Sequence, residues 1–470
     1  MKKNNSITKA PIKSLVKGYS LLPNPSLLST ILNEQLVPSV GCTELSALAY
    51  ASALAYHILI GKIPAPFQIS KPLSYQKILP HQIKRIIVTV DRNVYKNGFV
   101  AQIPVGKNLK GLAYAAALGI FGNPSDKLTI FKQLTKTDTA QAINLIHHNK
   151  IEIKTLEDRE ISPYFEVQLL TKNNSATVVI EYQHFNVSLI KRNNRIIHQL
   201  SKQSINNSFS PAMKELGNLS LAQLVHLVEY LTAKDKQHIR NSLQINQRLS
   251  QYGLKHYRNG LTGSLQNLVR RKILNNDLVY HAQLDTASAV ETRMSGVPLE
   301  VMSLSGSGNQ GLTALLPVGS VAQNRGLLDE ERLVKSLALS CLVTAYTTYH
   351  IGYLTPLCGC IVKAGVGAAA GIAYYLKGRT NQIDSTIKNM LGSSAGIICD
   401  GAKVGCALKV ANATYTAIES ALLGLNNISI PKSKGLITYT TEQSVRNLGI
   451  FSRAMTSADK TLVNILSAQT

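Results

Sequence analysis

Apolar and polar residues follow two different rhythms along the chain, and these separate helical segments from strands. Between residues 26 and 60, leucine, isoleucine and alanine recur at helical spacing, and Pro64 and Pro66 close this segment. Residues 83–90 and 176–182 are instead β-branched runs bounded by polar turns, which is typical of strands. The pattern therefore predicts helices first and a sheet after them.

The sheet-forming region also contains helical segments, and helices dominate the rest of the chain. Residues 165–170 and 187–191 have strand character, whereas residues 111–121 and 140–147 have helical spacing. From residue 218 onward, helical patterns prevail. A region of mixed strands and helices beside a mainly helical remainder predicts an α+β protein.

We therefore expect a mainly helical domain formed by both chain ends, with a mixed α/β domain inserted between them. A length of 470 residues is consistent with two or three domains. The expected parts are a flexible basic tail at 1–25, the start of the helical domain at 26–66, the inserted α+β domain at 67–205 and the rest of the helical domain at 206–470.

The chain carries a large positive charge that is not concentrated in one motif. It has 50 Lys and Arg residues against 26 Asp and Glu residues, a formal net charge of +24. Such a charge favours nucleic-acid binding when it accompanies a recognisable binding motif. Neither zinc-finger spacing nor an aromatic-studded RNA-binding segment is present. A generally basic surface is therefore the better interpretation.

The sequence disfavours secretion and membrane insertion. The N-terminus has lysines but lacks an apolar core of signal-peptide length. The most apolar stretch, 337–376, is interrupted by His350, Pro356 and Lys363 among others. It therefore lacks the roughly 18 to 20 apolar residues that a membrane span needs. We expect a cytoplasmic protein with reduced thiols.

The cysteines point most directly to a function. Four of the six fall in the glycine-dense stretch 358–411, and a fifth, Cys42, follows a glycine far upstream. Glycine allows close approach to a bulky group, and thiolates are the ligands of iron–sulfur clusters. No C-x2-C pair is present, which argues against a compact ferredoxin or zinc-ribbon site. The alternative is a buried apolar role, which is favoured for Cys341 and balanced for Cys406.

A glycine-rich segment is a candidate binding loop. Residues Ser305-Gly306-Ser307-Gly308-Asn309-Gln310-Gly311 offer N–H groups and small polar side chains that could cradle a carboxylate or phosphate. The segment lacks the Gly-Lys-Ser/Thr of a P-loop and the pattern of a dinucleotide site. A plain tight turn is the alternative.

Two lysines are further candidates. Lys96 precedes Asn97-Gly98, which lies between two strand-like runs and predicts a hairpin turn. Lys403 lies four residues after Cys399, so a helix through both would place them on one face. Beside a cluster, such a lysine is a candidate base or carboxylate clamp; a solvated lysine is the alternative.

Taken together, these motifs resemble the L-cysteine desulfidase family, which is related to the α chain of iron–sulfur L-serine dehydratases. The resemblance covers roughly residues 26–470, and Leu45, where the family usually has proline, is a departure from it. The five motifs that carry it, in order, are Gly41-Cys42-Thr43-Glu44, Lys96-Asn97-Gly98, the segment 305–311, Cys358-Gly359-Cys360 and Ile398-Cys399-Asp400-Gly401-Ala402-Lys403.

The resemblance implies an oxygen-sensitive [4Fe–4S] lyase that works without pyridoxal phosphate and splits L-cysteine into pyruvate, ammonia and sulfide. The metal ligands that it implies are Cys42, Cys360 in preference to Cys358, and Cys399. The related dehydratases carry another cluster cysteine eleven residues after the equivalent of Cys399, a position that Val410 holds here. Cys42 is then the natural replacement, and Cys406 stays as the alternative.

The resemblance also implies roles for other residues. Lys403 and Glu44 are the expected catalytic residues. A base takes the Cα proton, an open iron binds the leaving group, and the glycine-rich segment holds the carboxylate. The expected substrate-binding residues are Ser305, Ser307, Asn309, Lys96 and Asn97.

Several questions about function stay open at this point. L-serine or another β-substituted amino acid is an alternative substrate, and a non-catalytic basic binding protein with a structural cluster is a rival function. We expect a small amino acid as ligand, no membrane or nucleic-acid partner, and a homodimer as the candidate assembly.

Overall fold

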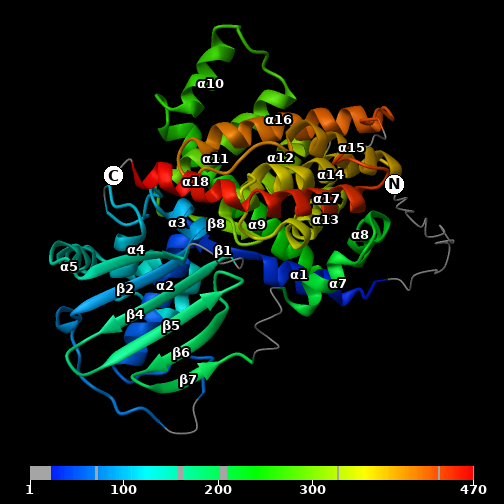
Figure 1. Cartoon of the computed structure of the whole chain (residues 1–470). Coiled ribbons are helices and arrows are strands. Elements are labelled where there is room, and N and C mark those ends of the chain that lie inside the picture. Colours follow the sequence, from blue (N-terminus) through cyan, green and yellow to red (C-terminus); the bar gives the residue numbers. More distant parts are fainter. Residues whose placement is uncertain are drawn as a thin grey trace, which may run out of the picture.

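The computed structural model describes residues 23–68, 72–106, 108–156, 162–201, 209–324, 326, 328–431 and 435–468. The basic tail expected at 1–25 lies almost entirely outside the described residues. Figure 1 shows a body of helices and, beneath it in that view, a six-stranded sheet. The predicted fold class, a mainly helical α+β protein with an inserted mixed sheet, is confirmed.

The sheet has the strand order β3-β2-β4-β5-β6-β7, in which β2 and β3 are parallel and the other pairs antiparallel. Its side chains alternate between two faces: Phe165 and Val167 are fully buried, whereas Glu166 and Gln168 stand on the other side. The strands are β2 (Arg85–Asp91), β3 (Ile151–Leu156), β4 (Tyr164–Leu170), β5 (Ser175–Glu181), β6 (Val187–Arg192) and β7 (Arg195–Gln199).

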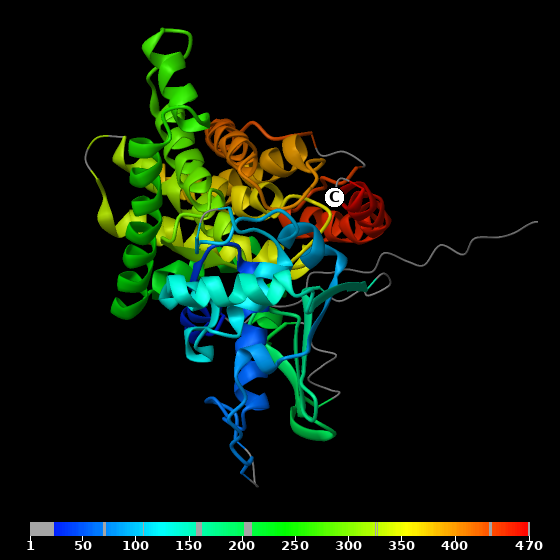
Figure 2. The ribbon, with the colours of Figure 1, turned by 90° about the vertical axis from the view of Figure 1, so that its left-hand side faces the viewer.

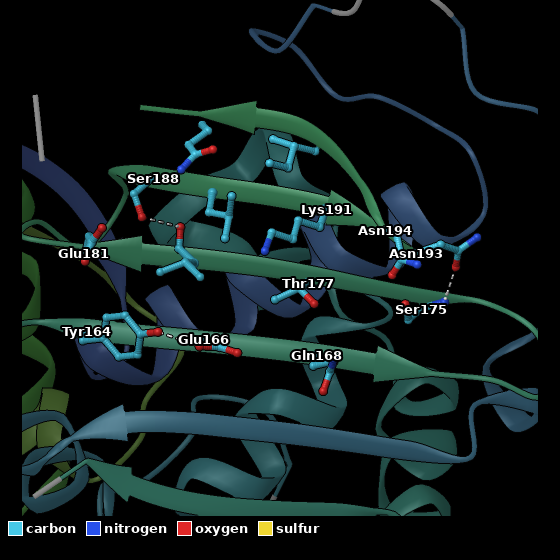
Figure 3. A pocket seen from close by; sticks show the side chains of 14 residues that line it. Tyr164, Glu166, Gln168, Ser175, Thr177, Glu181, Ser188, Lys191, Asn193 and Asn194 are labelled. Atoms are coloured by element: carbon cyan, nitrogen blue, oxygen red, sulfur yellow. Dashed lines mark hydrogen bonds between the residues drawn. The ribbon is translucent and has the colours of Figure 1, made fainter. Parts of the chain in front are cut away.

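Helices pack on one face of this sheet. The central helix α2 contacts β4, β5 and β6, and α4 packs beside it. The opposite face forms a broad hollow of about 700 Å³ lined by side chains such as Thr177 and Lys191 (Figure 3). The helical layer consists of α2 (Thr43–Leu59), α4 (Leu112–Gly119), η2 (Pro124–Gln133) and α5 (Lys136–His147).

The helical body is built around α12 (Gly308–Gln323), which contacts α11, α13, α14 and α16. Small residues allow close packing: a Cβ at Gly367 would lie 2.2 Å from Thr344 Oγ1 of α13. The other helices are α1 (Ser26–Gln35), α7 (Pro211–Gly217), α8 (Leu221–Leu227), η3 (Val228–Tyr230), α9 (Ala233–His256), α10 (Leu261–Arg270), α11 (Leu278–Met294), α13 (Glu330–Ile351), η4 (Cys360–Gly365), α14 (Val366–Tyr375), α15 (Thr380–Ser394), α16 (Cys406–Leu425), α17 (Thr441–Ala454) and α18 (Thr456–Ser467). A short η1 (Pro80–Gln82) precedes the sheet.

A two-stranded ribbon ties the start of the chain to the body. β1 (Leu36–Val40) pairs antiparallel with β8 (Glu300–Leu304). After β8 the chain turns back along the ribbon as α12, so closely that a Cβ at Gly311 would lie 1.8 Å from the carbonyl oxygen of Met302. Glycine is therefore needed at 311 for the fold-back, which brings the amino end of α12 toward the residues that follow β1.

The expected segment 26–66 is divided between two cores. α1 packs against α13 and α7 in the helical body, whereas α2 belongs to the core between the sheet and the helices that cover it. Leu48 and Leu54 of α2 are fully buried there. A helix that is apolar on all sides, as α2 is, can be covered completely only between two layers. The junction between the two parts of the molecule therefore falls beside Cys42; Figure 2 shows both parts from the side.

The structure corrects three local predictions. The prediction of a hairpin turn at 97–98 is wrong, because Arg92–Gly98 forms helix α3. The Asp91 carboxylate caps this helix by accepting hydrogen bonds from the N–H groups of Asn93 and Val94. The glycine-rich segment is mostly the first turn of α12, which Ser307 caps. The helix assumed to run through 399–403 is absent, since α16 begins only at Cys406.

The apolar stretch 337–376 is interior to the helical body. It contains the end of α13, the turn η4 and α14, with an irregular segment at 352–359 between them. In the part of the chain that the structure describes, no helix combines the length and the apolar character needed to cross a membrane.

Candidate active site

A cavity of about 70 Å³ lies where the helical body meets the sheet domain, and five of the six cysteines line it. The sixth, Cys341, is fully buried in the apolar core of α13, as the sequence predicted. None of the six forms a disulfide. The five lining cysteines are Cys42, Cys358, Cys360, Cys399 and Cys406.

The turn between β1 and α2 places Cys42. Gly41 has φ +77°, and a Cβ at this position would lie 2.7 Å from Cδ of Pro104. Both the backbone conformation and the available space therefore require glycine. Cys42 follows as the residue that precedes α2, and its side chain is buried. The glycine of this motif thus sets the position of the thiol.

Backbone pairing holds Cys358 and Cys399 side by side. The Cys358 N–H donates to the carbonyl of Ile397 at 2.8 Å, and the Cys399 N–H donates to the carbonyl of Pro356 at 2.7 Å. Cys360 then begins η4, a single π-helical segment of a kind that is common at functional sites. The two cysteine motifs therefore form one structural unit.

A second glycine shapes the loop between Cys399 and Cys406. Gly401 has φ +96°, and a Cβ there would lie 2.5 Å from the carbonyl oxygen of Lys96. This conformation prevents a helix, so α16 starts at Cys406, whose Sγ donates to the Gly401 carbonyl at 3.6 Å. The two thiols reach the cavity from a loop and from a helix start, and not from one helical face.

Burial disfavours ionisation of most of these thiols. It raises the pKa of Cys399, and raises that of Cys406 to about 11. The hydrogen bond between Cys358 and Cys360 raises the pKa of Cys360 and lowers that of Cys358 to about 7. Negative charge on one sulfur opposes ionisation of the next, so a cationic centre among them would stabilise the thiolate forms.

The donor set fits an iron–sulfur cluster. Thiolates are the usual ligands of such clusters, and five thiols surround one cavity. Among the described residues, no three side chains of the His, Cys, Asp or Glu type converge closely enough to hold a single metal ion. The fit to a cluster therefore rests on the type of donor, thiols that line one cavity.

Glu44 and Asn97 connect the cysteines on the sheet side of the cavity. Cys42 Sγ donates to Glu44 Oε2 at 3.0 Å, and Asn97 Nδ2 donates to Glu44 Oε1 at 2.9 Å. The Asn97 Oδ1 atom accepts from Cys399 Sγ at 3.7 Å. Burial raises the pKa of Glu44, but His184, 3.9 Å away, and the Cys42 hydrogen bond outweigh burial and lower it to about 2. Glu44 is therefore an anion in the site.

Lys96 is not part of the cavity wall. Its Nζ lies 2.6 Å from Asp459 Oδ1 of α18 and 3.0 Å from Asn93 Oδ1, and both charged side chains are buried. The ion pair joins α3 to the C-terminal helix, which packs beside it in Figure 1. The Lys96-Asn97 motif is therefore split between a buried structural lysine and an amide that faces the cysteines.

The glycine-rich segment contributes the amino end of α12. Ser307, Asn309 and Gln310 line the cavity, whereas Ser305 is buried in the preceding turn and does not line it. The Ser307 Oγ accepts from the Gln310 N–H at 3.4 Å. Asn309 Oδ1 accepts from Arg293 at 2.8 Å. Three of the five expected substrate-binding residues thus reach the site: Ser307, Asn309 and Asn97.

Lys403 also lies outside the cavity wall. It forms an ion pair with Asp400, and two-fifths of its side chain is exposed. The lysine that lines the cavity is Lys363, which is 1% exposed and whose Nζ donates to the carbonyls of Gly352 and Tyr353, each at 2.9 Å. Burial lowers the pKa of Lys363 to about 8.

Sequence reasoning missed two charged residues of the cavity, Lys363 and Arg293. Lys363 is a single cation in an apolar, glycine-rich run. This context could have marked it as a site residue, because a lysine is rarely buried unless it is paired. Arg293 lies near the end of α11, among both polar and apolar residues, so its sequence context does not mark it as a buried cation. Only the packing of α11 against α12 brings it to the site.

A comparison with protein-family models matches residues 126–464 to the serine dehydratase alpha chain. This match spans well over half of the chain. The chain belongs to the serine dehydratase alpha chain family. The matched part contains Arg293, Lys363 and the four C-terminal cysteines of the cavity, while Cys42 and Asn97 lie before it.

Relatives of this family member extend over nearly the whole chain. The UPF0597 protein of Clostridium tetani is 35% identical over 94% of this chain and 98% of its own length. The UPF0597 protein of Desulfatibacillum aliphaticivorans is 34% identical over 93% of this chain, and that of Clostridioides difficile is 33% identical over 93%. The likeness therefore includes most of the sheet domain as well as the helical body.

Proposed function

We propose that this protein is an iron–sulfur lyase that works without pyridoxal phosphate and eliminates the β-substituent of a small amino acid. The proposed substrate is L-cysteine, and the products are pyruvate, ammonia and sulfide. The observation that carries the proposal is one small buried cavity that brings five thiols together with a lysine, a carboxylate and an arginine. Membership of the serine dehydratase alpha chain family supports related lyase chemistry.

In this proposal Cys42, Cys360 and Cys399 would hold a [4Fe–4S] cluster. Cys358 and Cys406 line the same cavity and are the alternatives to Cys360 and Cys42. When bound, the cluster would supply a Lewis acid for the leaving sulfur or hydroxyl group.

Lys363 is the proposed base, in place of Lys403. Its two hydrogen bonds to carbonyl groups fix the amine in the wall of the cavity and use two of its protons. The remaining position carries either the third proton or the lone pair, so the amine can take the Cα proton without losing its anchors. Burial, which favours the neutral amine, suits this role.

The other cavity residues orient the substrate. The Glu44 carboxylate, held by Asn97, offers an anionic partner for the substrate ammonium group. Ser307 and Asn309, at the amino end of α12, lie on the side proposed for the substrate carboxylate.

The reaction balances without another cofactor. As Lys363 takes the Cα proton, the electrons of the Cα–H bond form the Cα–Cβ double bond and the Cβ–S bond breaks. The aminoacrylate that results becomes an imine, and water hydrolyses the imine to pyruvate and ammonia. The sulfur leaves as hydrosulfide.

The proposal predicts that anaerobically prepared protein holds about four irons per chain and converts L-cysteine into equal amounts of sulfide and pyruvate. The measurements are iron and sulfide analysis followed by both product assays, with L-serine as the competing substrate. Pyruvate from L-serine at a higher kcat/KM would make the enzyme a serine dehydratase. Protein that stays free of iron after reconstitution, or that releases neither product, would contradict the proposal.

A second prediction separates Cys42 from Cys406 as the third ligand. Cys42→Ser is expected to lower the iron content to less than about half of the wild-type value, because a hydroxyl is a poor ligand for iron in a cluster. Cys406→Ser is expected to keep nearly all of it. Iron analysis after identical reconstitution checks this, and the reverse result would assign the third position to Cys406.

A further inference from the structure

Arg293 is a buried cation that pairs with no acidic side chain in the part of the chain that the structure describes. It is 4% exposed and lines the cavity. Among the described residues, no carboxylate lies within 4.0 Å of its guanidinium nitrogens. Its neighbour Glu291 is occupied elsewhere, since it accepts from the N–H groups of Leu261 and Thr262. Burying a cation without a directly paired carboxylate is costly, so the wall of the cavity beside Arg293 favours an anionic ligand.

The hydrogen bonds of Arg293 fix its position without neutralising its charge. One terminal nitrogen donates to Asn309 Oδ1 at 2.8 Å, and the other donates to the Gly41 carbonyl at 2.7 Å and to Thr43 Oγ1 at 3.3 Å. All three acceptors are neutral. The buried Nε atom has no hydrogen-bond partner among the residues that the structure describes. A guanidinium has five N–H donors, so two remain after these three contacts.

The guanidinium lies against the amino end of α12. A Cβ at Gly308 would be 2.4 Å from Arg293 Nε, so a side chain at 308 would displace the arginine. The first N–H groups of a helix have no acceptor within the helix and carry partial positive charge. Here they add to the charge of Arg293 at the same wall of the cavity.

Gln310 supplies a second, independent sign of a ligand at this wall. Its side chain is 3% exposed and lines the cavity, and its Oε1 has no hydrogen-bond partner among the described residues. A Cβ at Gly359 would lie 3.1 Å from Gln310 Nε2, so the amide extends toward the segment that carries Cys360. The Oε1 atom can only accept a hydrogen bond, so it marks a position for a donor group of a polar ligand, beside the anionic group that Arg293 would bind.

We infer that Arg293 and the amino end of α12 form the subsite for the substrate carboxylate. This inference rests on the proposed function and adds to it a charge requirement. Substrates must be free amino acids with an unblocked carboxylate, so amino acid amides and decarboxylated amines are excluded. Glu44 faces the same cavity and lies on the side of Asn97, where the ammonium group is proposed to bind.

The test uses iron-loaded protein and ligands that cannot react. L-alanine has the carboxylate and ammonium groups but no leaving group, and L-alaninamide lacks only the carboxylate. Binding is measured by calorimetry for wild type, Arg293→Gln and Arg293→Lys. Arg332→Gln is the matched control, because Arg332 is a partly buried cation that does not line the cavity. Iron content and circular dichroism establish that each variant is folded and loaded.

Wild type and Arg332→Gln are expected to bind L-alanine at least 10-fold more tightly than L-alaninamide. Arg293→Gln is expected to lose about 10-fold or more in affinity for L-alanine, the usual effect of removing a charged hydrogen-bond partner. Arg293→Lys, which keeps the charge, is expected to fall between the two.

Two results would overturn the inference. One is equal binding of L-alanine and L-alaninamide by wild type, a comparison that does not depend on any variant. The other is wild-type affinity for L-alanine in folded Arg293→Gln. If wild type still converts L-cysteine in either case, the proposed function stands and only the carboxylate subsite is lost. If wild type converts no amino acid, the proposed function itself fails.

Discussion

Replacement of Lys363 by methionine is expected to reduce kcat for L-cysteine by about 10²- to 10⁴-fold, the usual contribution of a positioned general base. Methionine keeps much of the buried length of the side chain but has no proton acceptor of comparable strength. Lys363 lines the cavity, whereas Lys403 is paired with Asp400 outside it. The same replacement at Lys403 is therefore expected to change kcat less than about 3-fold, a bound set by the weak contribution of surface charges.

A pH profile adds a readout that a purely structural role for Lys363 would not give. The base must be neutral to accept the Cα proton, and burial lowers the pKa of Lys363 to about 8. Activity of the wild type is thus expected to rise with pH through about 8 and then level off. The residual activity of Lys363→Met should lack this rise. A large loss in Lys403→Met together with a small one in Lys363→Met would restore the base predicted from the sequence.

Replacement of Cys399 by serine is expected to abolish cluster binding, whereas Cys341→Ser should leave iron content nearly intact. Cys399 lies in the cavity wall, fixed by its backbone bond to Pro356, and its Sγ faces Asn97. Cys341 is fully buried in α13, where burial raises its pKa to about 12. The measurements are iron per chain and the visible absorption of anaerobic protein.

The Cys341→Ser variant controls for the cost of the substitution itself. Placing a hydroxyl in an apolar core destabilises a protein by about 1–3 kcal/mol, so a lower melting temperature with normal iron content is expected. Equal loss of iron in Cys341→Ser and Cys399→Ser would mean that the loss reflects stability, and it would remove the reason for assigning Cys399 as a ligand.

The sequence predicted helices and strands correctly wherever the apolar residues followed one clear periodicity. The β-branched runs at 165–170 and 176–182 became β4 and β5, because strand alternation is a local property that pairing only completes. The prediction from sequence failed at Asn97-Gly98, where a side-chain cap favours a helix over a turn. The Asp91 carboxylate stabilises the start of α3, and this local bond outweighs the turn preference of Asn-Gly.

Motif spacing alone placed side chains poorly. The four-residue spacing predicts that Lys403 shares a helical face with Cys399, but Gly401 at φ +96° breaks that helix. The motif likewise predicts that Lys96 and Asn97 both bind substrate, although adjacent helical residues point in different directions. Lys96 turns to Asp459, and Asn97 turns to Glu44.

What the sequence determined by itself was the chemistry of the donors and the glycines that position them. A thiol remains a soft metal ligand in any fold, and the positive φ of Gly41 and Gly401 was available only to residues without a Cβ. The tertiary structure alone decided which side chains share the cavity. Cys42 and Arg293 come from different cores and meet there because β1 pairs with β8 and α12 folds back along the ribbon. Such long-range packing leaves no local pattern in the chain, since it depends on surfaces that exist only after the helices and strands have formed.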